Sequence, residues 1–95
     1  MKKLNWNCDK NTILKESRSI SFEDVIFCLE NGKILDKLDH PNPQKYPNQK
    51  LFIIEINEYA YLVPFVETED EIFLKTIIPN RQATRKYLDG GKNER

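Results

Sequence analysis

The chain has few of the residues that build metal and redox sites. It holds one histidine and two cysteines in 95 residues, and Cys8 and Cys28 are far apart in the sequence. A structural zinc site needs about four Cys or His ligands at short spacings. The sequence therefore predicts no metal site and no cofactor. Two separated cysteines are typical of reduced thiols, so we expect a cytoplasmic protein.

Long apolar runs are also missing. A helix needs roughly 20 apolar residues to cross a bilayer. The longest run here, residues 59–66, is interrupted by Pro64. The basic start of the chain lacks the apolar segment of a secretory signal, so we expect neither export nor contact with a membrane. The length suits one domain with a single core, which we place at residues 1–91, followed by a frayed tail at residues 92–95.

Charge of one sign is not in excess. Fifteen Lys and Arg residues balance fifteen Asp and Glu residues. The distribution is uneven, because residues 75–95 carry six cations against two acids, and acids cluster in residues 67–71. A surface divided in this way can attract phosphate in one place while the whole protein stays neutral. Scattered, solvated charge is the alternative interpretation.

Periodicity and capping residues predict helices. Residues 9–18 form a polar helix. A second helix begins after Ser21, which is followed three positions later by an aspartate, and it ends at the Asn-Gly pair of residues 31–32. Residues 80–88 form the last helix, which starts at an asparagine N-cap and is stopped by a Gly-Gly pair.

Alternating apolar residues predict strands between these helices. Asn57 and Glu58 are placed to form a two-residue hairpin turn, and Pro64 requires an edge position or a bulge. Consecutive strands joined by tight turns pair antiparallel. We therefore predict an α+β fold: an antiparallel sheet of about four to five strands, with two N-terminal helices and a C-terminal helix on one face. The predicted strands are residues 4–6, 34–38, 51–56, 59–67 and 72–78.

Three segments of the chain resemble a known family. Residues 4–11 read L-N-W-N-C-D-K-N, residues 20–25 read I-S-F-E-D-V, and residues 75–86 read K-T-I-I-P-N-R-Q-A-T-R-K. They are similar to the opening F-x-W-D-x-x-K, the helix start V-S-F-E-E-A and the ending R-I-I-S-A-R-x-A-T-x-x-E of the BrnT family. Its members are toxins of bacterial type II toxin–antitoxin systems. The resemblance implies a RelE/ParE-like fold.

The resemblance also implies a function. It predicts a toxin that cleaves mRNA without metal, free or on the ribosome, and inhibits translation. A cognate antitoxin, expected as a DNA-binding dimer, would neutralise the toxin, and only the antitoxin would touch promoter DNA. The chain departs from the family pattern, because Lys-His-Gly before the second segment and the final glutamate are absent. Three alternatives therefore stay open: a ParE-like gyrase poison, a degenerate module that only binds an antitoxin, and a non-toxic RNA-binding protein.

Cations carry the predicted catalytic site. Metal-free RNA cleavage needs a base for the 2′ proton, cations facing the phosphorane oxygens and an acid for the 5′-oxygen. Arg81 matches the family's arginine before Ala-Thr and is expected to face the phosphate. Its alternative is a surface ion pair. Lys75 and Lys50 complete the set, with Lys50 as a base if nearby cations weaken its hold on a proton. Convergence of the three on one phosphate favours a nuclease, and cations on separate faces favour a binding protein.

Four further residues are candidates for RNA contacts. Arg85 lies one helical turn after Arg81 and either extends the phosphate track or meets the antitoxin. Lys10 falls in the opening segment of the resemblance. Tyr46 either stacks a base or anchors its loop. His40 is the only side chain whose ordinary pKa suits acid–base chemistry near neutral pH, and its alternative role is structural.

Overall fold

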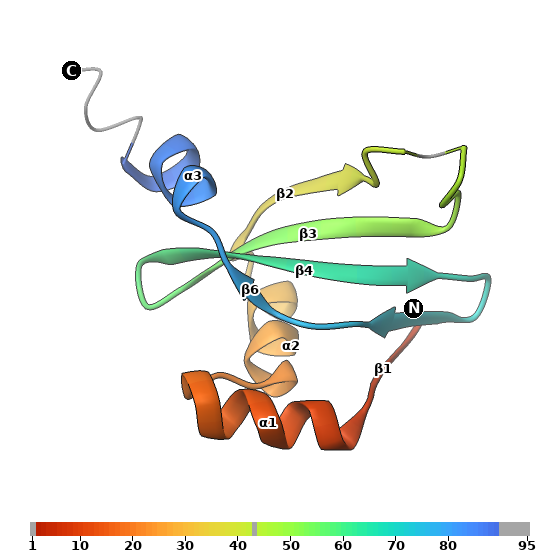
Figure 1. The fold of residues 1–95 in the computed structure, drawn as a ribbon, viewed down its shortest axis with the longest axis horizontal. Coiled ribbons are helices and arrows are strands. Elements are labelled where there is room, and N and C mark those ends of the chain that lie inside the picture. The colour runs from red at the N-terminus through yellow and green to blue at the C-terminus, as the bar shows by residue number, and fades with distance from the viewer. Residues whose placement is uncertain (1, 43, 90–95) are drawn as a thin grey trace.

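A six-stranded mixed sheet with three helices makes up the protein, so the predicted α+β class is confirmed (Figure 1). The computed structural model describes residues 2–42 and 44–89. None of its helices has the length and apolar character that a membrane span requires. The elements are β1 (Lys3–Trp6), α1 (Cys8–Arg18), α2 (Phe22–Glu30), β2 (Ile34–Asp39), β3 (Gln49–Ile56), β4 (Tyr59–Glu67), β5 (Glu71–Leu74), β6 (Ile78–Pro79), α3 (Arg81–Thr84) and the π-helical turn η1 (Arg85–Asp89).

The sheet is not purely antiparallel as predicted. Its strand order is β1-β5-β4-β3-β2, with β6 also paired to β4. All pairs are antiparallel except β1 and β5, which run parallel. Tight turns force antiparallel pairing only between consecutive strands. β1 leads into two helices instead, so its direction is set by where the chain returns to the sheet.

The last predicted strand is divided in two. Residues 72–78 form β5 and β6 instead of one strand, because the register between them shifts by one residue. Phe65 pairs with Leu74 and Leu62 pairs with Ile78, so three residues face two on β4. This is the geometry of a bulge. Pro64 lies opposite it, which agrees with the expectation that its missing N–H requires such an irregularity.

The predicted N-caps and hairpin turn are confirmed, whereas the predicted Gly-Gly stop at residues 90–91 and the predicted tail at residues 92–95 lie outside the described residues. Ser21 accepts a hydrogen bond from the Asp24 backbone N–H, and the Asp24 carboxylate accepts one from the Ser21 N–H. The Asn80 side chain caps α3. Asn57 and Glu58, with φ of 53° and 65°, form the two-residue turn between β3 and β4. The first helix begins one residue earlier than predicted, at Cys8.

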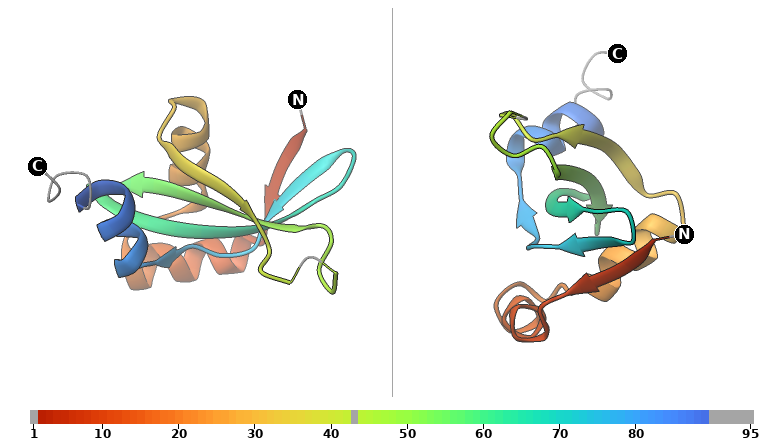
Figure 2. Two further views of the ribbon diagram at one scale, coloured as in Figure 1. Left: turned by 90° about the horizontal axis from the view of Figure 1, so that it is seen from above. Right: turned by 90° about the vertical axis from the view of Figure 1, so that its right-hand side faces the viewer.

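Alternation along the strands gives the sheet two different faces. Helices α1 and α2 pack on one, which we call the helix-covered face (Figures 1 and 2). Its buried core comprises Leu14, Ile20, Phe22, Val25, Cys28, Phe52, Ile54, Val63, Phe65, Leu74 and Ile77. The other face is covered only at one end, where Ala83 of α3 packs against Ile53 and Ala60. The prediction that all the helices cover one face is therefore wrong for the C-terminal helix.

Candidate nucleic-acid interface

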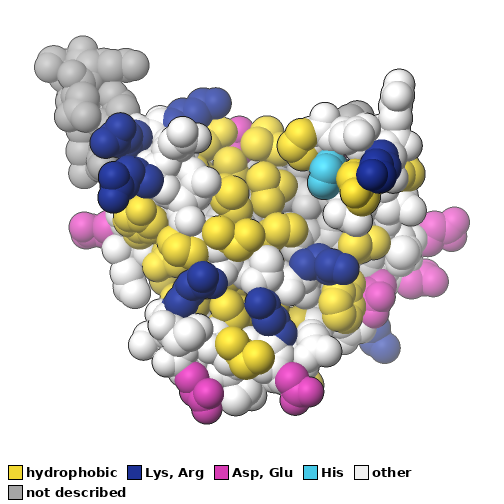
Figure 3. Space-filling view, viewed as in Figure 1, with side chains coloured by type: hydrophobic (Ala, Val, Ile, Leu, Met, Phe, Trp, Pro, Cys, Tyr) yellow, Lys and Arg dark blue, Asp and Glu magenta, His cyan; other side chains and the backbone are white. Residues whose placement is uncertain are grey.

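The part of the second face that α3 leaves uncovered, which we call the open face, is an apolar surface ringed by cations. Figure 3 shows the apolar centre with Lys and Arg side chains around it and acidic groups near the outline of the molecule. The strands present there the side chains that alternate with the core. Those on the open face are Leu38, Leu51, Pro64, Val66, Phe73 and Ile78. Leu38 and Ile78 are each 40% exposed, so this apolar surface meets solvent.

Lys75 and Arg81 stand at separate points along β4. The Lys75 N–H donates to the Pro64 carbonyl at 2.8 Å, which places Lys75 opposite Pro64 and on the open face. Arg81 follows Asn80, whose N–H donates to the Ala60 carbonyl at 3.1 Å. Four residues of strand separate these anchor points, or about 13 Å. Two cations at this spacing suit separate phosphates of one backbone better than a single phosphate.

Arg85 adds a second guanidinium to the Arg81 end. Its backbone N–H donates to the Arg81 carbonyl, so the two residues are neighbours one turn apart. Lys75, Arg81 and Arg85 are all exposed. Within residues 2–42 and 44–88, no carboxylate forms an ion pair with any of the three. Their charges are therefore available to a ligand.

Lys50 lies on the opposite face. It pairs directly with Phe65, whose ring is in the core beneath α1 and α2, and residues opposite each other on paired strands share a face. Its ammonium lies 3.2 Å from Glu67 Oε1, and Lys2 Nζ lies 2.7 Å from Glu67 Oε2. Lys50, Lys75 and Arg81 therefore do not converge on one phosphate, because strand alternation separates Lys50 from the other two.

The cluster around Glu67 is a structural ion-pair group. The hydrogen bond from Lys2 and the contact with Lys50 lower the pKa of Glu67 to about 2. Lys50 forms an ion pair with Glu67 Oε1, but the geometry of this contact is not that of a hydrogen bond. These contacts commit Lys50 to holding β3 against the end of β4, and they do not prepare it to take a proton from RNA.

His40 and Tyr46 lie at the far end of the open face from Arg81. The His40 N–H donates to the Gln49 carbonyl at 3.1 Å, which continues the pairing of β2 with β3. By alternation from Leu38, His40 belongs to the open face. The two rings are in contact in a tilted arrangement with centroids 4.4 Å apart, and Lys45 Nζ lies 5.5 Å from the Tyr46 centroid. Sequence reasoning missed Lys45, whose only signal was its position beside Tyr46.

Lys10 is not part of this group. It lies in the first turn of α1, where its backbone N–H donates to Asn7 Oδ1 at 3.0 Å. Its side chain is half-buried on a helix outside the sheet. The structure therefore places Lys75, His40 and Tyr46 on the open face and Arg81 and Arg85 on the C-terminal helical turns at its end, and it leaves Lys10 and Lys50 elsewhere.

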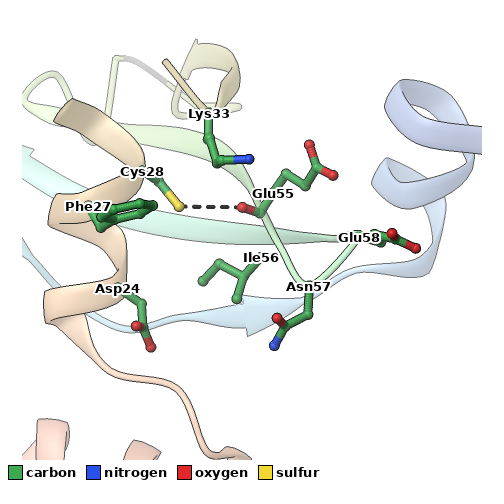
Figure 4. A pocket seen from close by; sticks show the side chains of 8 residues that line it. All are labelled: Asp24, Phe27, Cys28, Lys33, Glu55, Ile56, Asn57 and Glu58. Carbon is green, nitrogen blue, oxygen red and sulfur yellow. Dashed lines mark hydrogen bonds between the residues drawn. The ribbon is translucent and has the colours of Figure 1, made fainter. Parts of the chain in front are cut away.

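A hollow on the helix-covered side has the opposite character (Figure 4). It lies between α2 and the β3–β4 turn and is lined by Asp24, Phe27, Cys28, Lys33, Glu55, Ile56, Asn57 and Glu58. The Cys28 thiol donates to the Glu55 carbonyl at 3.3 Å, and burial raises its pKa. Three carboxylates against one lysine make this hollow a poor site for RNA. Across residues 2–42 and 44–89, no three His, Cys, Asp or Glu side chains are grouped so as to hold a metal ion.

Comparison with known proteins gives no assignment. No family model, curated protein or solved structure matches the chain. A function for this chain can therefore be inferred only from the geometry of the open face and from the three sequence segments described above.

Proposed function

We propose that this protein is a toxin that acts on RNA, with the open face as its RNA site. The observation that carries the proposal is that Lys75 on the open face and Arg81 and Arg85 at its helical end are all exposed and have no acidic partner among residues 2–42 and 44–88. RNA-binding proteins neutralise phosphates with such cations. The apolar surface between them suits the faces of bases and sugars.

The spacing of these groups supports an extended ligand. His40 stands level with Val66 on β4, and Asn80, the residue before Arg81, stands level with Ala60. Six residues of strand separate the two positions, or about 20 Å. A strand of about four nucleotides spans such a length, which is at the low end for small single-strand binders. The site thus takes a segment of backbone and not an isolated phosphate.

The resemblance to BrnT toxins adds cleavage to this binding. In the proposed reaction, the 2′-hydroxyl loses its proton to solvent and its oxygen attacks the adjacent phosphorus without metal. The bond from phosphorus to the 5′-oxygen breaks, which leaves a 2′,3′-cyclic phosphate, and the departing 5′-oxygen takes a proton from solvent. Arg81 and Arg85 face the phosphorane oxygens, because planar guanidinium groups match phosphate geometry. The outcome is loss of mRNA and arrest of translation. A cognate antitoxin that covers the open face would silence the protein, and promoter DNA would contact only the antitoxin.

One observation favours a second candidate, a toxin that binds its target without cutting. Lys50 is paired with Glu67 on the opposite face, so the site lacks the third cation expected of the nuclease. The cations of the open face are spread along a strand, which is an arrangement for binding. A ParE-like gyrase poison and a module that only binds an antitoxin both belong to this candidate.

The deciding experiment measures RNA cleavage in EDTA by purified protein, on naked mRNA and in a translating extract. The nuclease proposal predicts cutting that falls by roughly 10²–10³ in Arg81→Ala, the usual loss for one preorganised electrostatic donor. Lys15→Ala is the control, because Lys15 lies on α1, outside the open face. Its only ion pair among the described residues, 3.9 Å from Lys15 Nζ to Glu23 Oε1, is between two exposed side chains and contributes little to stability. Intact RNA with retained, salt-sensitive binding would reject cleavage and support a protein that binds RNA without cutting it, whereas a folded protein that halts growth but leaves RNA uncut and unbound would support the second candidate. Neither cutting nor binding would end the proposal.

A further inference from the structure

The tilted pair of His40 and Tyr46 rings is the only close aromatic pair at an end of the open face among the residues the structure describes. Its centroids are 4.4 Å apart and its planes are inclined by 40°. Both side chains are half-buried, so part of each ring meets solvent. The other aromatic pairs lie in the core or on the β4 strand near the hairpin.

Asn42 holds this pair in place. Its backbone N–H donates to His40 Nδ1 at 3.0 Å, and its backbone carbonyl accepts from the Tyr46 N–H at 3.0 Å. Its side-chain oxygen also accepts from the Lys45 N–H at 3.3 Å. These bonds orient the His40 ring and hold the backbone at Lys45 and Tyr46 before any ligand arrives, and a preorganised site loses less entropy on binding.

The hydrogen bond at Nδ1 also fixes the tautomer of His40. Because Nδ1 accepts a hydrogen bond from the Asn42 N–H, the ring proton of the neutral imidazole is on Nε2. The His40 Nε2–H is then a hydrogen-bond donor at the edge of the His40–Tyr46 pair. A nucleobase on the pair would offer carbonyl and ring-nitrogen acceptors at its own edge.

We infer that the RNA bound by the open face is single-stranded and that one of its bases stacks on the His40–Tyr46 pair. This inference depends on the proposed function of that face. In a duplex the base faces are covered by their neighbours, so only an unpaired strand can offer one to an aromatic ring. Stacking on aromatic rings accepts any base, so the pair selects for single strands and not for a sequence.

Lys45 does not block this site. Its ammonium lies 5.5 Å from the Tyr46 centroid. An exposed cation–π contact is weaker than the stacking of a base on an aromatic ring. An incoming base therefore displaces the ammonium, which is on a flexible, exposed side chain and can pair with the adjacent phosphate.

The test compares three probes: a fluorescent single-stranded RNA of about eight nucleotides, an abasic oligomer of the same length, and a hairpin duplex. Tyr46→Leu is expected to weaken binding of the single strand about ten-fold and to leave the abasic oligomer unchanged. Tyr46→Phe keeps the ring and should bind like the wild type. Arg81→Gln should weaken the single strand and the abasic oligomer equally, because it removes a phosphate contact.

Other results would overturn the inference. If Tyr46→Leu weakens both oligomers equally, the ring only supports the loop, and if it weakens neither, no base stacks there. Equal affinity of the wild type for hairpin and single strand would remove the claim of single-strand selectivity. A wild type that binds none of the probes contradicts the proposed function itself. A wild type that binds through Arg81 but is indifferent to Tyr46 contradicts only the stacking.

Discussion

Asn11 is a buried polar residue that joins the two N-terminal helices. Only 6% of its surface is exposed. Its side-chain oxygen accepts from the Phe22 N–H at 2.7 Å, and its amide donates to Glu23 Oε1 at 2.9 Å, which lowers the pKa of Glu23. The cap at Ser21 is visible in the sequence because its partner is three residues away. The role of Asn11 cannot be seen in the sequence, because its hydrogen-bond partners depend on how α1 and α2 pack together.

Glu58 occupies a backbone conformation that disfavours any side chain. Its φ is 65°, in the left-handed region, at the second position of the β3–β4 turn. Glycine is the preferred residue there. Glu58→Gly is expected to raise the free energy of unfolding by about 0.5–1 kcal/mol, the relief of strain less the added chain entropy. Urea unfolding measures it, and Glu58→Ala, which keeps the Cβ, should give no such gain. An equal gain in both variants would assign the effect to lost charge.

The Glu67 ion pairs predict an acid-dependent stability. Because contacts in the folded state lower the pKa of Glu67 from 4.5 to about 2, its contribution is complete above pH 4.5. The contribution is lost as the pH falls towards 2, where the folded protein also binds the proton. Glu67→Gln should cost about 1 kcal/mol at pH 7, because Lys2 and Lys50 stay 36% and 32% exposed.

Urea unfolding of wild type and Glu67→Gln at pH 7, 4 and 2.5 checks this dependence. The difference between the two proteins should shrink as the pH falls. Glu69→Gln, on the exposed turn that follows, is the matched control and should show little difference at any pH. A gap between wild type and Glu67→Gln that stays constant would show that the carboxylate charge is not the source.

At the scale of elements, the sequence predicted those features that depend on contacts between residues close together in the chain. The caps at Ser21 and Asn80 and the turn at Asn57 depend on neighbours in sequence, and all three were predicted. The division of residues 72–78 into β5 and β6 depends on the register against β4. The parallel pairing of β1 depends on the path of the whole chain, so neither was accessible from periodicity.

The docking of α3 on the sheet depends on a hydrogen bond that periodicity could not predict. The Ala60 N–H donates to Thr84 Oγ1 at 2.9 Å, and Thr84 donates to the Asn80 carbonyl at 2.9 Å. Thr84 is 6% exposed. Thr84→Val keeps the shape but leaves the buried Ala60 N–H without an acceptor, so it should cost about 1–3 kcal/mol. This threonine belongs to the Ala-Thr pair of the family resemblance, and here its hydroxyl is structural.

Thermal or urea unfolding of Thr84→Val measures that cost. Thr84→Ser is the control, because it retains the hydroxyl and loses only a methyl group. The valine variant should be the less stable of the two. If the serine variant is the less stable, packing and not the hydrogen bond holds α3 in place.

At the scale of the molecule, the sequence predicted an uneven distribution of charge. It did not predict which cations lie on the open face and which lie on the helix-covered face. Lys50 and Lys75 both looked available for one site. The structure separates them because side chains alternate between the two faces of the sheet. Lys50 shares the helix-covered face with Phe65, and Lys75 shares the open face with Pro64. The result is a neutral protein with a cationic open face and an acidic hollow on the other side (Figures 3 and 4).

The central claim, that the open face binds RNA, is tested most directly by the salt dependence of binding to a single-stranded RNA. The matched variants each lose three positive charges: Lys75, Arg81 and Arg85→Gln on the open face, or Lys15, Lys33 and Lys37→Gln elsewhere. Each phosphate contact contributes about −0.7 to the slope of log K against log salt for single strands. We predict a slope shallower by about two units in the first variant and an unchanged slope in the second. Equal changes in both, or none in the first, would contradict the account.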